Sequence, residues 1–175
     1  NPDGSLLPRA DFERLMRLPV FVMLDEAYAD FASHSFMDSI AKYPNLVVLR
    51  TFSKSPALAG LRVGYGVMPR VLADNVWKIV MPFNVNAVGV VAALAALEDW
   101  DYTKSIAQKM IAEREKLSEA LHHFDFLKPY PSQGAFILCK VIGRDAAQLR
   151  ALLAKQGVLI RVFDNAHVKN CIRVS

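Results

Sequence analysis

One lysine, Lys54, lies in a loop of small residues between two apolar runs, residues 46–49 and 61–67. A lysine amine that is desolvated or close to other cations loses its proton readily and then forms imines with carbonyl compounds. A solvated loop lysine explains this stretch equally well. The loop alone therefore leaves both interpretations open.

A carboxylate follows another apolar run. Residues 20–24 predict a buried strand, and Asp25 comes directly after it. A carboxylate at the end of a buried strand is costly unless it has a partner. The strand–helix–strand rhythm of this region favours a parallel sheet, whose ligands bind at the carboxyl ends of the strands. Because Asp25 and Lys54 both lie at such ends, we expect them to share one site.

Pyridoxal phosphate would use the residues of this region. The cofactor needs a lysine for its aldehyde, an anion at its ring nitrogen and donors for its phosphate. Lys54 would form the imine, Asp25 would pair with the ring nitrogen, and Tyr28 would donate to the ring oxygen. Ser53 and Arg62 would hold the phosphate, since arginine makes charge-assisted bonds to it. The hypothesis gives catalytic roles to Lys54, Asp25 and Tyr28.

These motifs resemble those of fold-type I pyridoxal-phosphate aminotransferases, most closely the histidinol-phosphate aminotransferase branch. The resemblance covers essentially the whole chain and rests on residues 25–28 (Asp-Glu-Ala-Tyr), 51–54 (Thr-Phe-Ser-Lys) and 60–65 (Gly-Leu-Arg-Val-Gly-Tyr). It implies an α/β fold of the PLP-dependent transferase type, with a mainly parallel sheet and helices in a large domain and a smaller α+β C-terminal domain. It also implies that Asn1 donates to the cofactor's ring oxygen, although a turn explains an Asn-Pro pair equally well.

Two arginines lie in late apolar runs that predict strands. Arg161 belongs to residues 158–163 and Arg173 to residues 171–174. Burying an arginine in an apolar strand costs free energy unless its charge meets an anion. Successive residues of a strand point to opposite faces, however, so each arginine side chain could also point to solvent. The resemblance implies that Arg173 binds the substrate's α-carboxylate and Arg161 a substrate phosphate. The branch often has Ala-Asn-Phe where residues 134–136 are Gly-Ala-Phe. The missing asparagine weakens the assignment of the substrate and leaves the cofactor chemistry unaffected.

The function that the resemblance implies is transamination of histidinol phosphate with 2-oxoglutarate or glutamate, in histidine biosynthesis. Lys54 would move a proton between substrate and cofactor as general base and acid. An aromatic-amino-acid aminotransferase or a phosphothreonine decarboxylase of the same fold would use the same residues. A different class of protein is a catalytically silent fragment, because we expect the chain to lack the family's first half. The full-length protein would be a homodimer.

The domain organisation expected from the sequence has a change near residue 98. Residues 1–98 would form the C-terminal part of the cofactor-binding large domain, and residues 99–175 a small, incomplete α+β domain. Helices are predicted over 8–17, 71–79, 85–97, 103–123 and 145–156, and strands over 20–24, 46–49, 61–67, 136–141, 158–163 and 171–174. Residues 85–97 are apolar nearly all round, which predicts a buried helix.

Composition narrows the classes of partner. The chain has 175 residues, of which 53% are hydrophobic and 22% charged, and this suits a domain with a substantial core. A net charge of +4 without a basic run gives little support to nucleic-acid binding, and no stretch has the length of a membrane span. Cys139 and Cys171 indicate reduced thiols in a cytoplasmic protein. No spacing of histidines and cysteines predicts a metal site.

Overall fold

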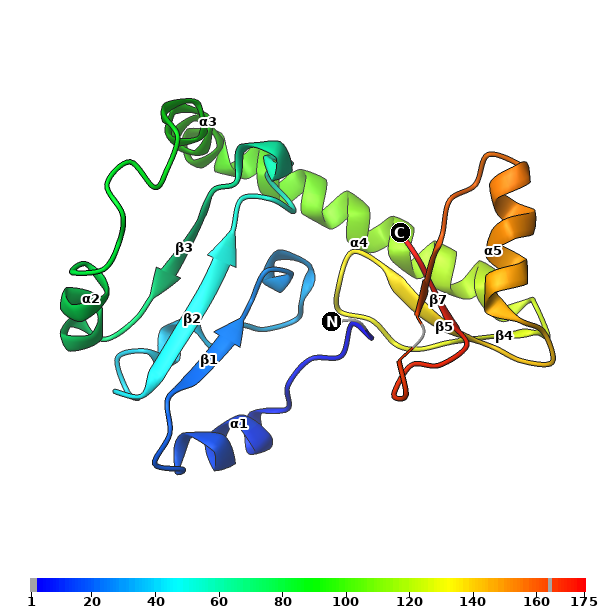
Figure 1. Ribbon diagram of the computed structural model, residues 1–175, viewed down its shortest axis with the longest axis horizontal. Coiled ribbons are helices and arrows are strands. Elements are labelled where there is room, and N and C mark those ends of the chain that lie inside the picture. The colour runs from blue at the N-terminus through cyan, green and yellow to red at the C-terminus, as the bar shows by residue number, and fades with distance from the viewer. Residues whose placement is uncertain (1–2, 164) are drawn as a thin grey trace. The chain divides into compact units, whose positions relative to one another are not determined.

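The computed structural model describes residues 3–163 and 165–175, which form two compact units (Figure 1). Of these residues, Leu7–Ala107 form one unit, and residues 3–6, 108–163 and 165–175 form the other. The division falls inside helix α4 (Trp100–His122), whereas the sequence placed a domain change near residue 98. The first residues join the C-terminal unit because the backbone N–H of Gln133 donates to the Gly4 carbonyl at 2.8 Å.

A three-stranded sheet organises the Leu7–Ala107 unit, in the order β1-β2-β3. Its strands are β1 (Val22–Asp25), β2 (Leu46–Thr51) and β3 (Gly64–Val67). Strands β1 and β2 are parallel, as predicted, with Asp25 opposite Leu49, so both strands end at one edge of the sheet. Strand β3 runs antiparallel to β2. The connection between them holds a 3-10 turn, Ala59–Leu61, and no crossover helix of the kind that parallel neighbours need.

Helix α1 (Arg9–Met16) covers one face of this sheet. Its buried Phe12 and Met16 pack with Leu46 and Val48 of β2, and Val22 and Leu24 of β1 lie against the same cluster. The prediction of a strand buried on both faces is wrong for β1. Phe21 and Met23 alternate with the packed residues and are 70% and 66% exposed. Short 3-10 helices, Ala29–Phe31 and Met37–Ser39, occupy the connection from β1 to β2.

Helix α3 (Ala87–Glu98) follows helix α2 (Arg70–Val76) along the chain. Most of its surface is exposed, so the prediction of a buried helix is wrong. Asn86 caps α3 by accepting the N–H of Gly89 at 2.7 Å. Gly89 and Ala93 are its buried residues, while Val91 is 68% exposed. One stripe of the helix packs closely: a Cβ at Gly89 would lie 2.7 Å from a methyl group of Val63. No element among the described residues buries the rest of its apolar surface.

An antiparallel sheet organises the other unit, in the order β4-β5-β7-β6. Its strands are β4 (Leu127–Pro129), β5 (Ile137–Val141), β6 (Arg161–Phe163) and β7 (Cys171–Val174). Leu121 of α4 and Ala146 of helix α5 (Ala146–Lys155) pack on one face with Ile137, Cys139 and Ile172. Strand β4 was not predicted, because three residues that include a proline carry little strand signal. Strand β6 is shorter than predicted, since residues 158–160 precede it.

No helix among the described residues is long and apolar enough to cross a membrane.

The thiol of Cys139 predicts a pH-dependent stability. Burial, with a smaller contribution from the nearby Cys171, raises the pKa of Cys139 from 9.0 to about 11. Because the folded pKa lies above the unfolded one, the stability that this thiol contributes is complete below pH 9 and is lost as the pH rises toward 11. Urea unfolding of wild type and Cys139→Ala should therefore give a difference in unfolding free energy that shrinks by about 1–2 kcal/mol across this range. A difference independent of pH would contradict the assignment.

Candidate active site

Three residues that the sequence predicted for one site lie at or just after the carboxyl ends of β1 and β2. Asp25 ends β1, and its Oδ1 accepts the N–H of Ala27 at 3.0 Å, which turns the chain toward Tyr28. Lys54 follows the end of β2, and its Nζ lies 4.9 Å from the centre of the Tyr28 ring. An ammonium group at this distance from an aromatic ring is attracted to it. The amine is therefore held at the sheet edge where Asp25 lies.

The loop that carries Lys54 has a defined backbone. The N–H of Ala57 donates to the Lys54 carbonyl, and the N–H of Leu58 donates to the Phe52 carbonyl, both at 2.9 Å. Ala57 has a φ of +59°, a left-handed conformation that is uncommon outside glycine. The buried ring of Phe52 packs with Val63 and Ala93. Backbone hydrogen bonds and this apolar cluster together fix one side of the loop.

Ser53 and Arg62, the predicted phosphate ligands, lie on either side of this loop. Ser53 is half-buried, and its N–H donates to Thr51 Oγ1 at 3.0 Å. Arg62 is exposed and left-handed, with a φ of +58°, at the end of the 3-10 turn. Its Nη1 donates to the Ala59 carbonyl at 2.7 Å. The other donors of an exposed guanidinium are the ones that an anion would use.

A polar cluster beside Lys54 was missed by sequence reasoning. We call it the Arg50 network; it consists of Glu26, Asp30, Ser35, Arg50 and Ser55. Arg50 Nε donates to Glu26 Oε2 at 3.0 Å and Nη1 to Asp30 Oδ1 at 3.3 Å, and Nη2 donates to Ser35 Oγ at 2.9 Å. These three charged side chains are at most 21% exposed.

The sequence carried a signal for this network. Arg50 lies in an apolar strand, and an arginine there needs an anion. The cost that makes Arg161 and Arg173 candidates for binding an anion also predicts a carboxylate partner for Arg50.

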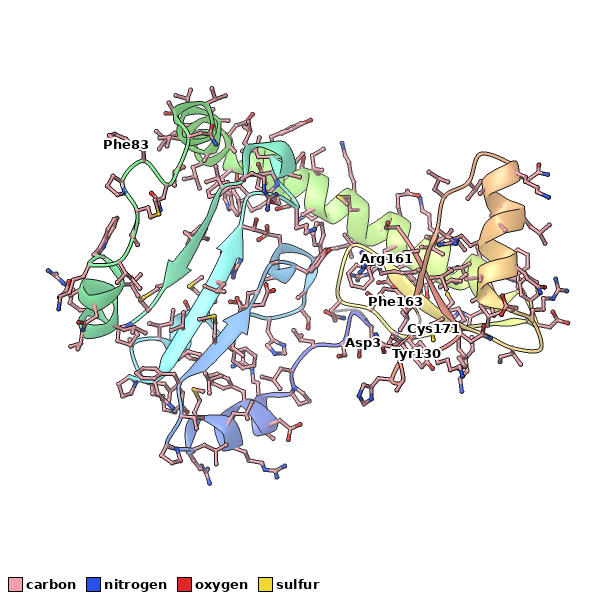
Figure 2. The ribbon with its side chains drawn as sticks, in the orientation of Figure 1. Asp3, Phe83, Tyr130, Arg161, Phe163 and Cys171 are labelled. Atoms are coloured by element: carbon pink, nitrogen blue, oxygen red, sulfur yellow. The ribbon has the colours of Figure 1, made fainter. Side chains whose placement is uncertain are left out.

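The C-terminal unit holds the two arginines predicted to bind substrate. Arg161 and Arg173 are directly opposite each other in the β6–β7 pair, which confirms that they lie on adjacent strands and places them on one face of the sheet. The guanidinium of Arg161 lies 5.3 Å from the centre of the Phe163 ring (Figure 2). That of Arg173 lies 5.5 Å from the same ring and 4.6 Å from the Phe136 ring. The two aromatic partners were not predicted.

The predicted residues thus fall into two sets. The Lys54 set belongs to the Leu7–Ala107 unit, and the arginine pair belongs to the other unit. The remaining predicted residue, Asn1, lies outside the described residues. Within residues 3–163 and 165–175, no group of three His, Cys, Asp or Glu side chains is arranged to hold a metal ion.

A model of the family described as aminotransferase class I and II matches residues 1–175. The chain belongs to this family. Histidinol-phosphate aminotransferase 1, chloroplastic, of Arabidopsis thaliana is 45% identical over 177 residues, which cover 100% of this chain and 42% of that protein. Histidinol-phosphate aminotransferase of Roseiflexus castenholzii is 46% identical, with 100% and 48% covered. The chain spans about half the length of the curated relatives it matches.

Solved structures of this aminotransferase family have the same fold. Histidinol-phosphate aminotransferase of Sinorhizobium meliloti, solved in complex with pyridoxal-5'-phosphate, superposes with a TM-score of 0.85 at 34% identity and covers 100% of this chain and 50% of that one. L-threonine-O-3-phosphate decarboxylase of Porphyromonas gingivalis superposes with a TM-score of 0.88 at 27% identity, with 100% and 56% covered. The predicted fold-type I class is thereby confirmed.

The Arg50 network predicts a large stability effect at one position. In Arg50→Met, the half-buried carboxylates of Glu26 and Asp30 would lose their cation, so the unfolding free energy should fall by about 2–3 kcal/mol. Arg14→Met is the matched control, because Arg14 pairs with Asp11 at 3.2 Å on the surface, with 81% and 51% of the two side chains exposed. That exposed pair should contribute less than about 1 kcal/mol. Urea denaturation measures both, and equal losses would contradict the prediction.

Proposed function

We propose that the protein containing this chain is a pyridoxal-phosphate-dependent aminotransferase that acts on histidinol phosphate, with 2-oxoglutarate as the amino acceptor. The observation that carries the proposal is the Lys54 amine, 4.9 Å from the Tyr28 ring at the sheet edge where Asp25 ends β1. Support for the substrate comes from relatives named histidinol-phosphate aminotransferase, between 38% and 46% identical across this chain.

The donor set fits pyridoxal phosphate group by group. Lys54 offers an amine for the aldehyde, Asp25 a carboxylate for the ring nitrogen, and Tyr28 a hydroxyl for the ring oxygen. Ser53 and Arg62 offer a hydroxyl and a guanidinium for the phosphate. When bound, the cofactor supplies an electron sink for the pair of electrons left at the substrate carbon.

The residues of the chain supply position and proton transfer. Lys54 acts as general base at the substrate carbon and later returns the proton as general acid. The hydrogen bond from the Ala57 N–H to the Lys54 carbonyl holds the backbone of the loop from which the lysine side chain extends. Asp25 is anchored through the Ala27 N–H and presents its negative charge at the end of β1. The charge stabilises a protonated ring nitrogen.

The arginine pair supports an anionic substrate. The two arginines lie directly opposite each other on neighbouring strands, so two positive charges share one face of the sheet. Guanidinium groups bind a phosphate monoester or a carboxylate through charge-assisted hydrogen bonds. We assign the substrate phosphate to Arg161 and the α-carboxylate of an amino-acid substrate to Arg173.

A homodimer in the cytoplasm is part of the same proposal. The segment from Trp77 to Phe83, between α2 and α3, exposes large apolar side chains, and Phe83 is 99% exposed at its tip (Figure 2). An exposed apolar segment of this kind favours a protein partner, which we take to be a second copy of the protein. The two buried, unpaired cysteines suit a reducing compartment.

Covalent attachment of the cofactor tests the enzyme class. Pyridoxal phosphate followed by borohydride should label wild type on the peptide that contains Lys54, because reduction makes the bond to the amine permanent. Lys54→Ala should lose this label, and turnover should be abolished. The control is Lys78→Ala, since Lys78 donates to Asn75 on α2 and lies outside the site. Labelling of another lysine, or near-normal turnover of Lys54→Ala, would refute the proposal.

A second candidate function is decarboxylation of phosphothreonine. The structural similarity to the decarboxylase of Porphyromonas gingivalis favours it, with a TM-score of 0.88. Both substrates carry a phosphate, so the arginine pair suits either. Carbon dioxide release from phosphothreonine would identify the decarboxylase, and glutamate formation from 2-oxoglutarate would identify the aminotransferase.

Arg161 predicts the phosphate preference of the holoenzyme. Arg161→Gln should raise KM for histidinol phosphate by about 10–100-fold, because a hydrogen-bonded charge pair with the phosphate is lost. The rate with a phosphate-free amino donor, such as phenylalanine, should change little. Arg144→Gln is the control, because Arg144 also stacks on an aromatic ring in this unit, at 4.1 Å from Phe126. Steady-state kinetics would contradict the assignment if both variants behaved alike.

A further inference from the structure

The Lys54 loop has a second attachment that the proposed chemistry does not use. Ser55, the residue after Lys54, is only 4% exposed, and its hydroxyl donates to Oδ2 of Asp30. The other oxygen of the same carboxylate, Oδ1, accepts from Arg50 Nη1 at 3.3 Å. Arg50 lies in β2, before the loop begins. One carboxylate therefore bridges the chain on both sides of Lys54.

The bridge also connects two segments of the candidate site. Asp30 lies in the 3-10 turn Ala29–Phe31 that directly follows Tyr28. Its bond to Ser55 joins this turn to the loop that carries Lys54. The distance of 4.9 Å between the Lys54 amine and the Tyr28 ring thus spans two segments that Asp30 and Ser55 hold together.

Charge balance alone does not account for this arrangement. Arg50 already pairs with Glu26 at 3.0 Å, and Glu26 is further satisfied by the Ser35 hydroxyl and the Phe36 N–H, each at 2.7 Å. A second carboxylate, half-buried in Asp30, adds a desolvation cost. What Asp30 adds in return is a directional bond to the residue beside Lys54, with both of its oxygens engaged.

We propose that Asp30 and Ser55 are positioning residues for Lys54, which hold its amine in the orientation that reacts with the cofactor. This inference rests on the proposed function, in which Lys54 is the nucleophile. The bridge itself does not depend on that function. The existence of the bridge and its effect on the reactivity of Lys54 can therefore be tested separately.

The variants are Ser55→Ala, Asp30→Asn and the double variant. Ser105→Ala is the matched control, because Ser105 donates to the Tyr102 carbonyl at 2.7 Å on α4, away from the loop. Hydrogen exchange of the backbone amides of residues 53–58 measures the bridge without any cofactor. We expect exchange to rise about tenfold in Ser55→Ala and Asp30→Asn and to stay unchanged in the control.

Borohydride trapping of pyridoxal phosphate on Lys54 measures the positioning. At saturating cofactor, the rate constant for trapping should fall about tenfold in each single variant. The half-saturating cofactor concentration should change by less than about twofold, because Ser53 and Arg62 still hold the phosphate. A merely structural role would lower the amplitude of trapping with the folded fraction and leave the rate constant unchanged. The double variant should be no slower than either single one, since both changes break one unit.

The outcomes separate the two claims. If wild type is trapped on Lys54 but Ser55→Ala reacts at the wild-type rate, the inference is wrong and the proposed function stands. If wild type gives no adduct on Lys54, the proposed function fails. If hydrogen exchange in Ser55→Ala is also unchanged, Asp30 and Ser55 do not hold the loop, and the inference fails as well. Additive losses in the double variant would also overturn the inference, because they would mean that Asp30 and Ser55 act separately.

Discussion

The pairing of Arg50 with two half-buried carboxylates is the interaction on which the position of Lys54 depends. Partial burial of three charged groups is unfavourable unless each meets partners of opposite charge and good geometry. Arg50 meets this condition by donating to Glu26 and Asp30 at once. The pairing joins the end of β1, the turn that follows it and the end of β2. The chain is fixed before Lys54 by Arg50 and after it by Ser55, which donates to Asp30.

The arginines of the C-terminal unit are in a different setting, with Arg161 exposed at the start of β6. Arg161 and Arg173 lie against the Phe163 ring, and Arg173 also lies against Phe136. Aromatic faces attract a guanidinium. Arg50 contacts two carboxylates and a hydroxyl, whereas the arginine pair lies against aromatic rings. Arg50 therefore ties segments of its own unit together, and in the proposed function the arginine pair meets an anionic substrate.

Local signals in the sequence predicted much of the fold, and long-range contacts account for the rest. Pro8 and Asp145 flank the starts of α1 and α5 as expected, and the parallel β1–β2 pair follows from the predicted elements. Residues 85–97 are apolar nearly all round, and the burial predicted from this is wrong for α3, because a local pattern does not supply the element that would cover the helix. Contacts of Glu26 with Arg50, 24 residues apart, leave no periodic signal. The Lys54 loop could therefore be predicted as a site, and its support could not.

One corner of the C-terminal unit, beside Arg173, departs from the branch's usual pattern. The Ala-Asn-Phe of that pattern is Gly134, Ala135 and Phe136 here, and the retained Phe136 ring supports Arg173. A Cβ at position 134 would lie 2.9 Å from this ring, so the usual alanine would have to shift it. Arg114 also donates to the Gly134 carbonyl at 2.9 Å, which holds the backbone in place. The change from the usual pattern thus alters the platform beneath Arg173, while the cofactor residues, which belong to the other unit, are unaffected by it.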